Sequence, residues 1–274
     1  MNQATIAIPV YNGAAYIRES LMSAIEQSTK EVSILVADNG STDNTLDIVL
    51  EIARTDSRVN VLRSEQNLGA TWNFNRCLNY CQTEFFKWLA HDDVMHPEYI
   101  ERTVAVLSKE KDAVLATSSN SVIDSRGAHL KYEPSTLPLL DSDASSDRFR
   151  AYCLEQHNCF HVFGTIRIDA LRQTSLIQDY IGSDRVLLAE LALLGKSVVI
   201  NEPLLKRRVH ARQSVAIPIL SRETWFNPKL RRPPTPFLDK ALGFTIPALT
   251  SKTNLAQKAS CFAVSCKYWF TNLK

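Results

Sequence analysis

The chain has 274 residues, 45% of them hydrophobic, so it is long enough to bury one sizeable core together with an appendage. Its 31 basic and 29 acidic side chains leave a net charge of +2, which gives no general field for binding nucleic acid. The sequence has no window of about 18 uncharged apolar residues, and its start lacks the pattern of a secretory signal. We therefore expect a folded cytoplasmic protein whose six scattered cysteines are reduced.

The first half of the sequence alternates between two periodicities. Short β-rich runs occupy residues 5 to 10, 32 to 37, 58 to 63, 84 to 90 and 113 to 119. Apolar residues at helical spacing occupy residues 16 to 26, 44 to 53, 71 to 81 and 97 to 109. Strands that alternate with helices of this length imply right-handed crossovers. The pattern predicts an α/β fold with a mostly parallel central sheet flanked by helices.

The second half is less regular. Its pattern predicts a polar stretch at 120 to 150, helical residues at 146 to 157, a strand at 159 to 167, a helix at 183 to 195 and a strand pair at 196 to 210 interrupted by Pro203. Five prolines follow between residues 218 and 236, and then an amphipathic stretch runs from residue 255 to 269. We predict a main domain at residues 1 to 217 and a C-terminal extension at 218 to 274, in which a proline-rich linker precedes helix.

Polar clusters follow three of the predicted strands. They read "PVYNG", "DNGSTDN" and "HDD". Because ligands of such sheets collect beyond the carboxyl ends of the strands, we expect the three clusters to converge on one edge of the sheet. This edge is the predicted site.

Asp92 and Asp93 are adjacent carboxylates in the third cluster. At an effective dielectric of about 20, two such charges about 4 Å apart repel by roughly 4 kcal/mol, and a divalent cation removes this conflict. Mg²⁺ or Mn²⁺ suits hard oxygen ligands and typically completes its shell with substrate phosphates. The alternative is a solvated loop or a cap for the helix that opens at Pro97. Asp38, in the second cluster, is either a turn residue or an acceptor for the imide of uracil or thymine.

The segments "IAIPVYNG", "LVADNGSTDNTLDIV", "VLRSEQNLGATWNFNRCL" and "EFFKWLAHDDVMHPEYI" occur in this order, and "GSDRVLLAELALLGKSVVINEPLLKRRVH" follows them. Together they resemble the pattern of glycosyltransferase family 2, which has a GT-A fold, over roughly residues 4 to 215. The resemblance implies transfer of a sugar from a nucleotide diphosphate donor, with Mn²⁺ or Mg²⁺ as the cofactor.

The resemblance also implies roles for individual residues. Pro9, Val10 and Tyr11 would line the nucleotide base, and Asp38 and Asn39 would hold its polar edge. Asp92 matches the metal-binding position, and Asp93 would support the metal or the donor. The family often has a further Asp where this chain has Ala90, so a ribose or metal contact is either missing or supplied elsewhere, with His91 as one candidate.

Asp184 matches the family's general base at the start of the acceptor-side helix. Many members have Glu-Asp at this point, whereas this chain has Ser183 and Asp184. A general base needs one carboxylate, which accepts the proton of the acceptor hydroxyl as its oxygen attacks the anomeric carbon. The alternative role of Asp184 is a helix N-cap.

Arg208 and His210 alternate in a strand-like run and could face the same side. We expect His210 to bind the metal and Arg208 to bind the diphosphate, so that both stabilise the departing charge. Lys206, Arg207 and Arg212 are expected to be surface charge.

The resemblance implies a single displacement with inversion, which uses a UDP- or dTDP-sugar and an acceptor that is a glycan or a lipid-linked glycan in surface polysaccharide or glycan biosynthesis. A nucleotidyltransferase or a non-catalytic metal-dependent binding module are the rival functions. The C-terminal extension is a packing arm, a dimer element or a membrane-surface helix anchored by Lys267, Tyr268, Trp269, Phe270 and Lys274, which would place the protein at the inner face of the membrane.

Overall fold

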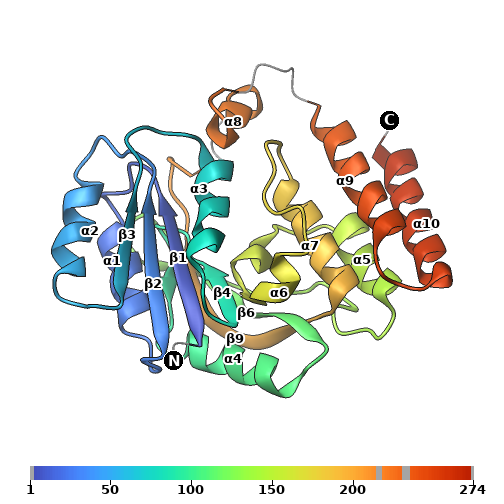
Figure 1. Cartoon of the computed structure of the whole chain (residues 1–274), viewed down its shortest axis with the longest axis horizontal. Coiled ribbons are helices and arrows are strands. Elements are labelled where there is room, and N and C mark those ends of the chain that lie inside the picture. Colours follow the sequence, from blue (N-terminus) through green and yellow to red (C-terminus); the bar gives the residue numbers. More distant parts are fainter. Residues whose placement is uncertain (1–2, 214–217, 230–234, 273–274) are drawn as a thin grey trace.

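The computed structural model describes residues 3 to 213, 218 to 229 and 235 to 272. Its centre is a curled, mixed sheet in the order β3-β2-β1-β4-β8-β6-β9-β5, with β7 paired to β6 (Figure 1). The strands of the first half are β1 (Ala4–Val10), β2 (Val32–Asp38), β3 (Val59–Arg63) and β4 (Phe85–Trp88). These four pair in parallel, with Val10 opposite Asp38 at the carboxyl edge. The predicted parallel arrangement is therefore confirmed for this half.

The strands of the second half make the sheet mixed. They are β5 (Val94–Met95), β6 (Ala113–Ile123), β7 (His129–Glu133), β8 (Thr165–Arg167) and β9 (Lys196–Arg208). β6 and β9 run parallel, but β8 is antiparallel to both β4 and β6. The strand pair predicted at 196 to 210 is wrong: β9 continues through Pro203, and its register against β6 shifts there. A bulge lets proline sit within a sheet without a lost ladder bond.

Helices cover both faces of the sheet. Those of the first half are α1 (Ile17–Ile25), α2 (Thr45–Ala53), α3 (Ala70–Arg76), the 3₁₀ turn η1 (Cys77–Tyr80) and α4 (Tyr99–Lys109). Alternate residues of β1 face opposite sides, so Ile6 and Ile8 join a core with α1, α2 and α4, whereas Ala7 joins a second core on the other face. Packing of the strands in these two cores fixes where each strand ends in the sheet and so positions the loops of the site.

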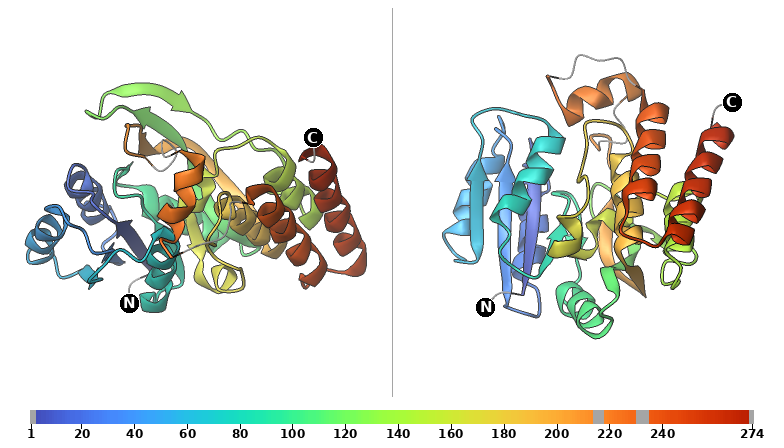
Figure 2. Two further views of the ribbon diagram at one scale, coloured as in Figure 1. Left: turned by 90° about the horizontal axis from the view of Figure 1, so that it is seen from above. Right: turned by 45° about the vertical axis from the view of Figure 1, so that its right-hand side comes forward.

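The remaining helices build the second core. They are α5 (Ser145–Leu154), the 3₁₀ turn η2 (Phe160–Phe163), α6 (Ile168–Leu171), α7 (Ser183–Leu194), α8 (Ile219–Phe226), α9 (Pro236–Thr250) and α10 (Leu255–Asn272). α9 and α10 form a hairpin on the side of the molecule away from α1 and α2 (Figure 2). The Phe244 ring of α9 is fully buried between Phe149 of α5 and Tyr268 of α10.

The C-terminal extension thus shares a core with α5 and α7. The boundary predicted at residue 217 lies outside the described residues and stays a prediction. All six cysteines are free thiols. Among the described residues, no helix combines the length and apolarity needed to cross a membrane.

Candidate active site

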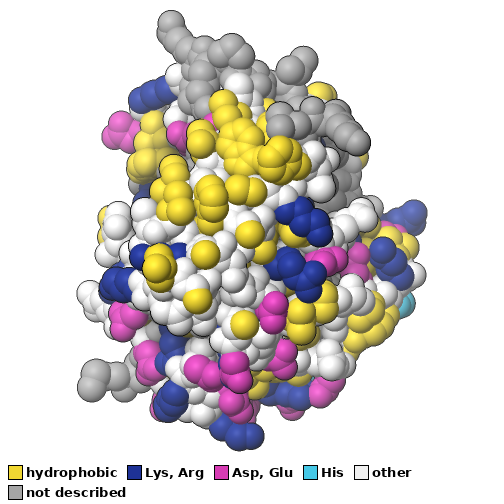
Figure 3. Space-filling model, turned by 90° about the vertical axis from the view of Figure 1, so that its right-hand side faces the viewer, with side chains coloured by type: hydrophobic (Ala, Val, Ile, Leu, Met, Phe, Trp, Pro, Cys, Tyr) yellow, Lys and Arg dark blue, Asp and Glu magenta, His cyan; other side chains and the backbone are white. Residues whose placement is uncertain are grey.

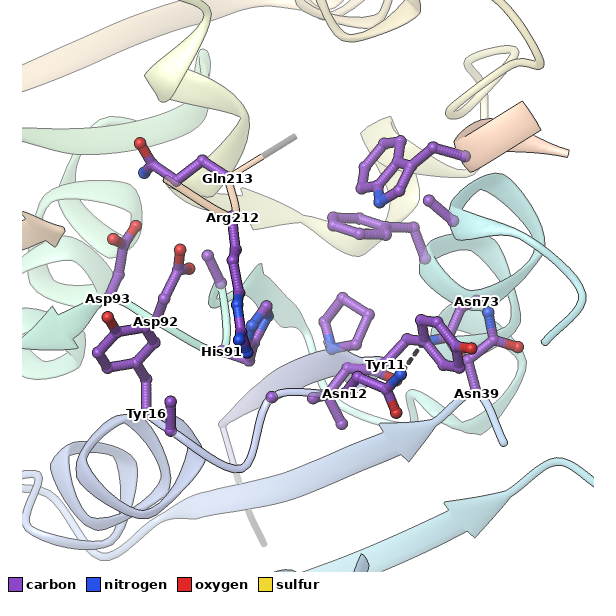
Figure 4. A pocket seen from close by; sticks show the side chains of 18 of the residues that line it. Tyr11, Asn12, Tyr16, Asn39, Asn73, His91, Asp92, Asp93, Arg212 and Gln213 are labelled. Atoms are coloured by element: carbon purple, nitrogen blue, oxygen red, sulfur yellow. Dashed lines mark hydrogen bonds between the residues drawn. The ribbon is translucent and has the colours of Figure 1, made fainter. Parts of the chain in front are cut away.

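A cleft of about 300 Å³ opens at the carboxyl ends of β1, β2 and β4, where the three polar clusters converge (Figure 4). The loops after these strands, α3, η2, the residues after β9 and α8 form its walls. A concave site of this size is suited to a small-molecule ligand. Of the residues singled out in the sequence, the cleft is lined by Pro9, Val10, Tyr11, Asn39, Asp92, Asp93 and His210, and also by His91. Asp38, Asp184 and Arg208 are not among its lining residues.

The loops after β1 and β2 are fastened to each other. The Asn12 amide N–H donates to Ser41 Oγ over 2.9 Å, and Asn12 Oδ1 accepts from the Thr42 N–H over 2.8 Å. The Gly13 N–H donates to Thr45 Oγ1 over 2.8 Å. Although burial raises the pKa of Asp43, hydrogen bonds from Thr45 and from the backbone of Ala14 outweigh it and lower that pKa. These hydrogen bonds therefore hold the two loops at the floor of the cleft in one arrangement without a ligand.

Gly13 is required by close packing. A Cβ at this position would lie 2.5 Å from His91 Cδ2 and 2.6 Å from Val10 Cγ2. The absent side chain lets the His91 ring lie against the loop, where it lines the cleft beside Asp92 (Figure 4). Burial also lowers the pKa of His91, which favours the neutral imidazole.

Asp38 ends β2 and is 1% exposed. Its Oδ2 accepts from the Ser41 N–H over 3.2 Å, whereas Oδ1 is buried and has no hydrogen-bond partner among the described residues. A buried carboxylate oxygen without a donor is costly unless a ligand supplies one. Asn39, the next residue, is fully engaged: its amide donates to Asn67 Oδ1 and Gly69 O, and accepts from the Leu68 N–H. Asn39 thus fixes the loop before α3.

Asp92 and His210 meet in the cleft. His210 Nε2 lies 2.8 Å from Asp92 Oδ2, and both side chains are mostly buried. The ring of Tyr16 packs against His210 with their centroids 4.8 Å apart. Among the described residues, no group of three or more His, Cys, Asp or Glu side chains could hold a metal. A carboxylate and an imidazole do fit a Mn²⁺ or Mg²⁺ ion whose other ligands come from substrate and water.

Asp93 also lines the cleft but has a hydrogen-bond partner other than that of Asp92. Its Oδ1 accepts from the Arg208 N–H over 2.9 Å in a buried setting. Burial, together with the charge of Asp92, raises the pKa of Asp93 to about 8. The two adjacent carboxyl groups therefore have separate partners.

Arg208 is 1% exposed and lies beneath the cleft. Its Nε donates to the Asp92 carbonyl over 2.9 Å, its guanidinium pairs with Glu19, and it lies over the Tyr16 ring at 4.8 Å. This placement differs from the diphosphate contact expected from the sequence. The side chain instead braces the loop that carries Asp92.

Two other arginines line the cleft. Arg207 is paired with Glu133 at 3.2 Å, and its guanidinium lies 4.4 Å from the Phe160 ring centroid. Arg212 extends along the cleft beside His91 (Figure 4) and has no acidic partner among the described residues. Sequence reasoning assigned both to the surface. In the sequence, only the position of Arg212 two residues after His210 could have indicated that Arg212 lines the cleft.

Asp184 lies in the first turn of α7. Its Oδ1 accepts from the Arg185 N–H over 2.9 Å, and a hydrogen bond links it to the Cys159 thiol, next to the cleft residue Phe160. Burial raises the pKa of Asp184 above its ordinary value. The N-cap of α7 is Gly182, so the structure does not bear out the alternative capping role.

Several aromatic residues that no sequence pattern singled out also line the cleft. They include Phe74 of α3, Phe160 and Phe163 of η2, and Trp225 of α8. α8 belongs to the C-terminal extension and packs against Gly69 of the loop before α3. Chain segments more than 140 residues apart thus share one wall, and no local pattern reports such proximity.

Comparison with known proteins agrees with this architecture. The profile described as "Glycosyl transferase family 2" matches residues 5–174. An uncharacterized glycosyltransferase of Haemophilus influenzae is 27% identical over 223 residues, which cover 78% of this chain and 67% of the relative. One from Rickettsia conorii is 34% identical over 139 residues, 49% of this chain but only 22% of the relative's length. Chondroitin synthase of Pasteurella multocida is 27% identical over 124 residues, 45% of this chain and 13% of that protein.

Solved structures share the fold. TarS 1-349 of S. aureus, in complex with UDP-GlcNAc, superposes with a TM-score of 0.73 at 18% identity, covering 98% of this chain and 73% of that one. A mannosyltransferase of Pyrobaculum calidifontis, in complex with GDP-Man and Mn²⁺, gives a TM-score of 0.60 at 14% identity, covering 98% and 74%. The family profile spans more than half of this chain. The chain belongs to glycosyltransferase family 2, with a GT-A fold.

Proposed function

We propose that this chain transfers a sugar, with inversion at the anomeric carbon, from a UDP- or dTDP-sugar to a hydroxyl of a glycan or lipid-linked glycan. One observation carries the proposal: His210 Nε2 lies 2.8 Å from Asp92 Oδ2 inside the cleft. The cleft is also lined by the end of β1, where we propose that the nucleotide binds, and by the 3₁₀ turn η2. This pair suits a cation-assisted diphosphate site. The similarity to chondroitin synthase supports polysaccharide or glycan biosynthesis as the setting.

The nucleobase lies between Pro9, Val10 and Tyr11 in this proposal. Although Asp38 does not line the cleft, its Oδ1 has no hydrogen-bond partner among the described residues and accepts a hydrogen bond from a base that reaches past the cleft wall. An imide N–H of uracil or thymine meets this need. Because the N1–H of guanine also can, and the P. calidifontis neighbour is a complex with GDP-Man, a GDP-sugar has to be tested alongside.

Asp92 and His210 would hold Mn²⁺ or Mg²⁺, and the ion would supply positive charge as the nucleoside diphosphate departs. Arg212 adds a second positive charge, because its guanidinium reaches the cleft and lacks an acidic partner among the described residues. Asp93 and Arg208 position Asp92 from beneath through the backbone.

Asp184 acts as the general base. As the acceptor oxygen forms its bond to the anomeric carbon, the bond from that carbon to the phosphate oxygen breaks, and the acceptor proton passes to Asp184. A raised pKa makes this carboxylate a better proton acceptor. Because Asp184 does not line the cleft and is bonded to the Cys159 thiol, the acceptor has to enter past Phe160 and Cys159.

Donor binding with and without Mn²⁺ tests the proposal. We expect UDP or dTDP to bind in isothermal titration calorimetry, to bind more tightly with Mn²⁺, and to lose that gain in Asp92→Asn. Asp141→Asn, at an exposed acid outside the cleft, is the matched control. Release of free nucleoside diphosphate distinguishes sugar transfer from nucleotidyl transfer, which releases pyrophosphate. If no nucleotide binds with Mn²⁺ and none binds without it, the proposal is wrong.

A further inference from the structure

The charge of the chain is unevenly distributed along its length. All 29 acidic residues occur in the first 239 positions, and from Lys240 to Lys274 the sequence contains five lysines and no acid. The body of the protein is therefore slightly acidic, whereas the end of the extension is purely basic. A chain segment whose charged side chains are all positive favours anionic partners and disfavours pairing with a copy of itself.

Exposed apolar side chains concentrate on the same part of the chain. Of the fourteen large hydrophobic side chains exposed in the described structure, seven belong to α9 and α10, although these helices have only 15 and 18 residues. Hydrophobic side chains gather on the face of the molecule where the two helices lie (Figure 3). Patches of this kind mark interaction sites.

α10 combines both features in one helix. Leu255, Phe262 and Phe270 are 83%, 40% and 75% exposed, and their spacing of seven and eight residues places them on one side of the helix. Lys258 and Lys267 fall on either side of this apolar row by the same periodicity. An apolar row flanked by cations, without acids, is typical of helices that lie in a lipid headgroup layer.

The opposite side of α10 is firmly packed, so the exposed row is not the result of a loose helix. Cys261, Ser265 and Tyr268 are buried, and the Tyr268 ring stacks on Phe237 of α9 at 6.0 Å. The Trp269 indole N–H donates to Thr245 Oγ1 over 3.1 Å. α10 is thus held rigidly on α5 and α9 with its outer face uncovered by described residues.

We propose that the outer face of α10, formed by Leu255, Phe262 and Phe270 with Lys258 and Lys267, docks on an anionic lipid surface. The helix would lie in the headgroup layer with its apolar row inserted and its lysines on the lipid phosphates. A symmetric pair of chains is disfavoured, because it would place lysines against lysines with no acid on either helix. The inference goes beyond sugar transfer and does not depend on it.

Co-sedimentation of the full chain with vesicles tests the docking. We expect binding to phosphatidylcholine vesicles that contain phosphatidylglycerol, little binding to pure phosphatidylcholine vesicles, and release by high salt. Lys258→Gln and Lys267→Gln should each weaken the partition about fivefold, and Phe262→Ser with Phe270→Ser should abolish it. Lys109→Gln and Tyr80→Ser, at exposed positions on other elements, are matched controls that should bind as the native chain does.

Thermal unfolding of each variant confirms that it is folded before its binding is compared. Failure of the native chain to bind anionic vesicles, or unchanged binding by the double phenylalanine variant, would overturn the proposal. Sedimentation velocity at several concentrations adds a second arm. A dimer that the phenylalanine variant dissociates would identify a second copy as the occupant and would likewise overturn it.

Discussion

Arg208 and Asp92 are joined through the main chain: Arg208 Nε donates to the Asp92 carbonyl over 2.9 Å, which leaves the Asp92 carboxylate to His210 in the cleft. Arg208 therefore acts on the position of Asp92, whereas Arg212 lines the cleft itself. The two arginines should respond very differently to mutation.

Arg212→Gln should weaken donor binding about 10- to 100-fold, since hydrogen bonds to charged groups contribute about 1.5 to 3 kcal/mol, and should leave the melting temperature unchanged. Arg208→Met should instead lower the free energy of unfolding by about 1 to 3 kcal/mol, because it leaves the partly buried Asp92 carbonyl without its donor, whereas water can solvate the half-exposed Glu19. Calorimetric titration with UDP and chemical denaturation separate the two effects. A stable Arg208→Met variant with a specific loss of donor affinity would restore the diphosphate contact expected from the sequence.

Asp184→Asn tests the general base. The amide keeps the size of the side chain but accepts no proton, so kcat should fall by about 10²- to 10⁴-fold while the dissociation constant of the donor stays the same. Single-turnover transfer and donor titration measure the two quantities. Normal turnover by this variant would show that another group takes the proton.

Gly13→Ala should change the shape of the cleft, although Gly13 has no chemical role in the proposed reaction. The added Cβ would clash with the His91 ring and with Val10, at a cost of about 1 to 3 kcal/mol, and should reduce donor affinity as the ring is displaced. Gly127→Ala serves as the control, since its φ of +86° brings backbone strain but no contact closer than 3.7 Å. If both variants bind UDP alike, the packing of His91 on Gly13 has no role in the site.

Acid should destabilise the protein through His161. Burial lowers the pKa of His161 to about 4, whereas in the unfolded chain it is near 6.5, so the unfolded state binds the proton more readily. Stability is therefore complete above about pH 6.5 and falls as the pH drops toward 4, by roughly 3 kcal/mol for this one group. Denaturation of the native chain and of His161→Gln at pH 8 and pH 5 measures the difference. The variant should lose less stability between the two pH values than the native chain does.

Phe244→Ala tests whether the extension unfolds with the body. The buried ring fills the space between α5, α9 and α10, so its removal should cost about 3 to 5 kcal/mol. A single cooperative transition, lowered as a whole and seen alike by circular dichroism and tryptophan fluorescence, is expected. Leu249→Ala, at an exposed position of the same helix, should change stability by less than about 0.5 kcal/mol. Two separate transitions would show that the extension is an independent unit.

Much of the first half could be predicted from the sequence, because each strand and helix there carries its own periodicity. β1 and β2 end within a residue or two of their expected ends. Because the strand ends are correct, the predicted convergence of the three loops is correct too. The second half was harder: β8 is three residues long and antiparallel, and its place between β4 and β6 depends on contacts distant in sequence. Pro203 suggested a break, yet a register shift accommodates it.

The site divides in the same way. Asp92 and Asp93 were visible as a pair, but only tertiary contacts send one toward His210 and the other toward the Arg208 backbone. Alternation predicted that Arg208 and His210 face one side, and both side chains pack on the ring of Tyr16, although β9 ends at Arg208 and His210 opens the turn that follows. Trp225 reaches the cleft from the extension, and nothing local to its sequence announces this.

The shared core has a consequence for engineering. Because Phe244 and Tyr268 pack directly on Phe149, the last two helices cannot be grafted onto another transferase as a portable module without its α5 surface being rebuilt to match. Chimeras that exchange the tail while keeping the recipient's own α5 should aggregate, and those that carry Ser145–Leu154 along with the tail should remain monodisperse.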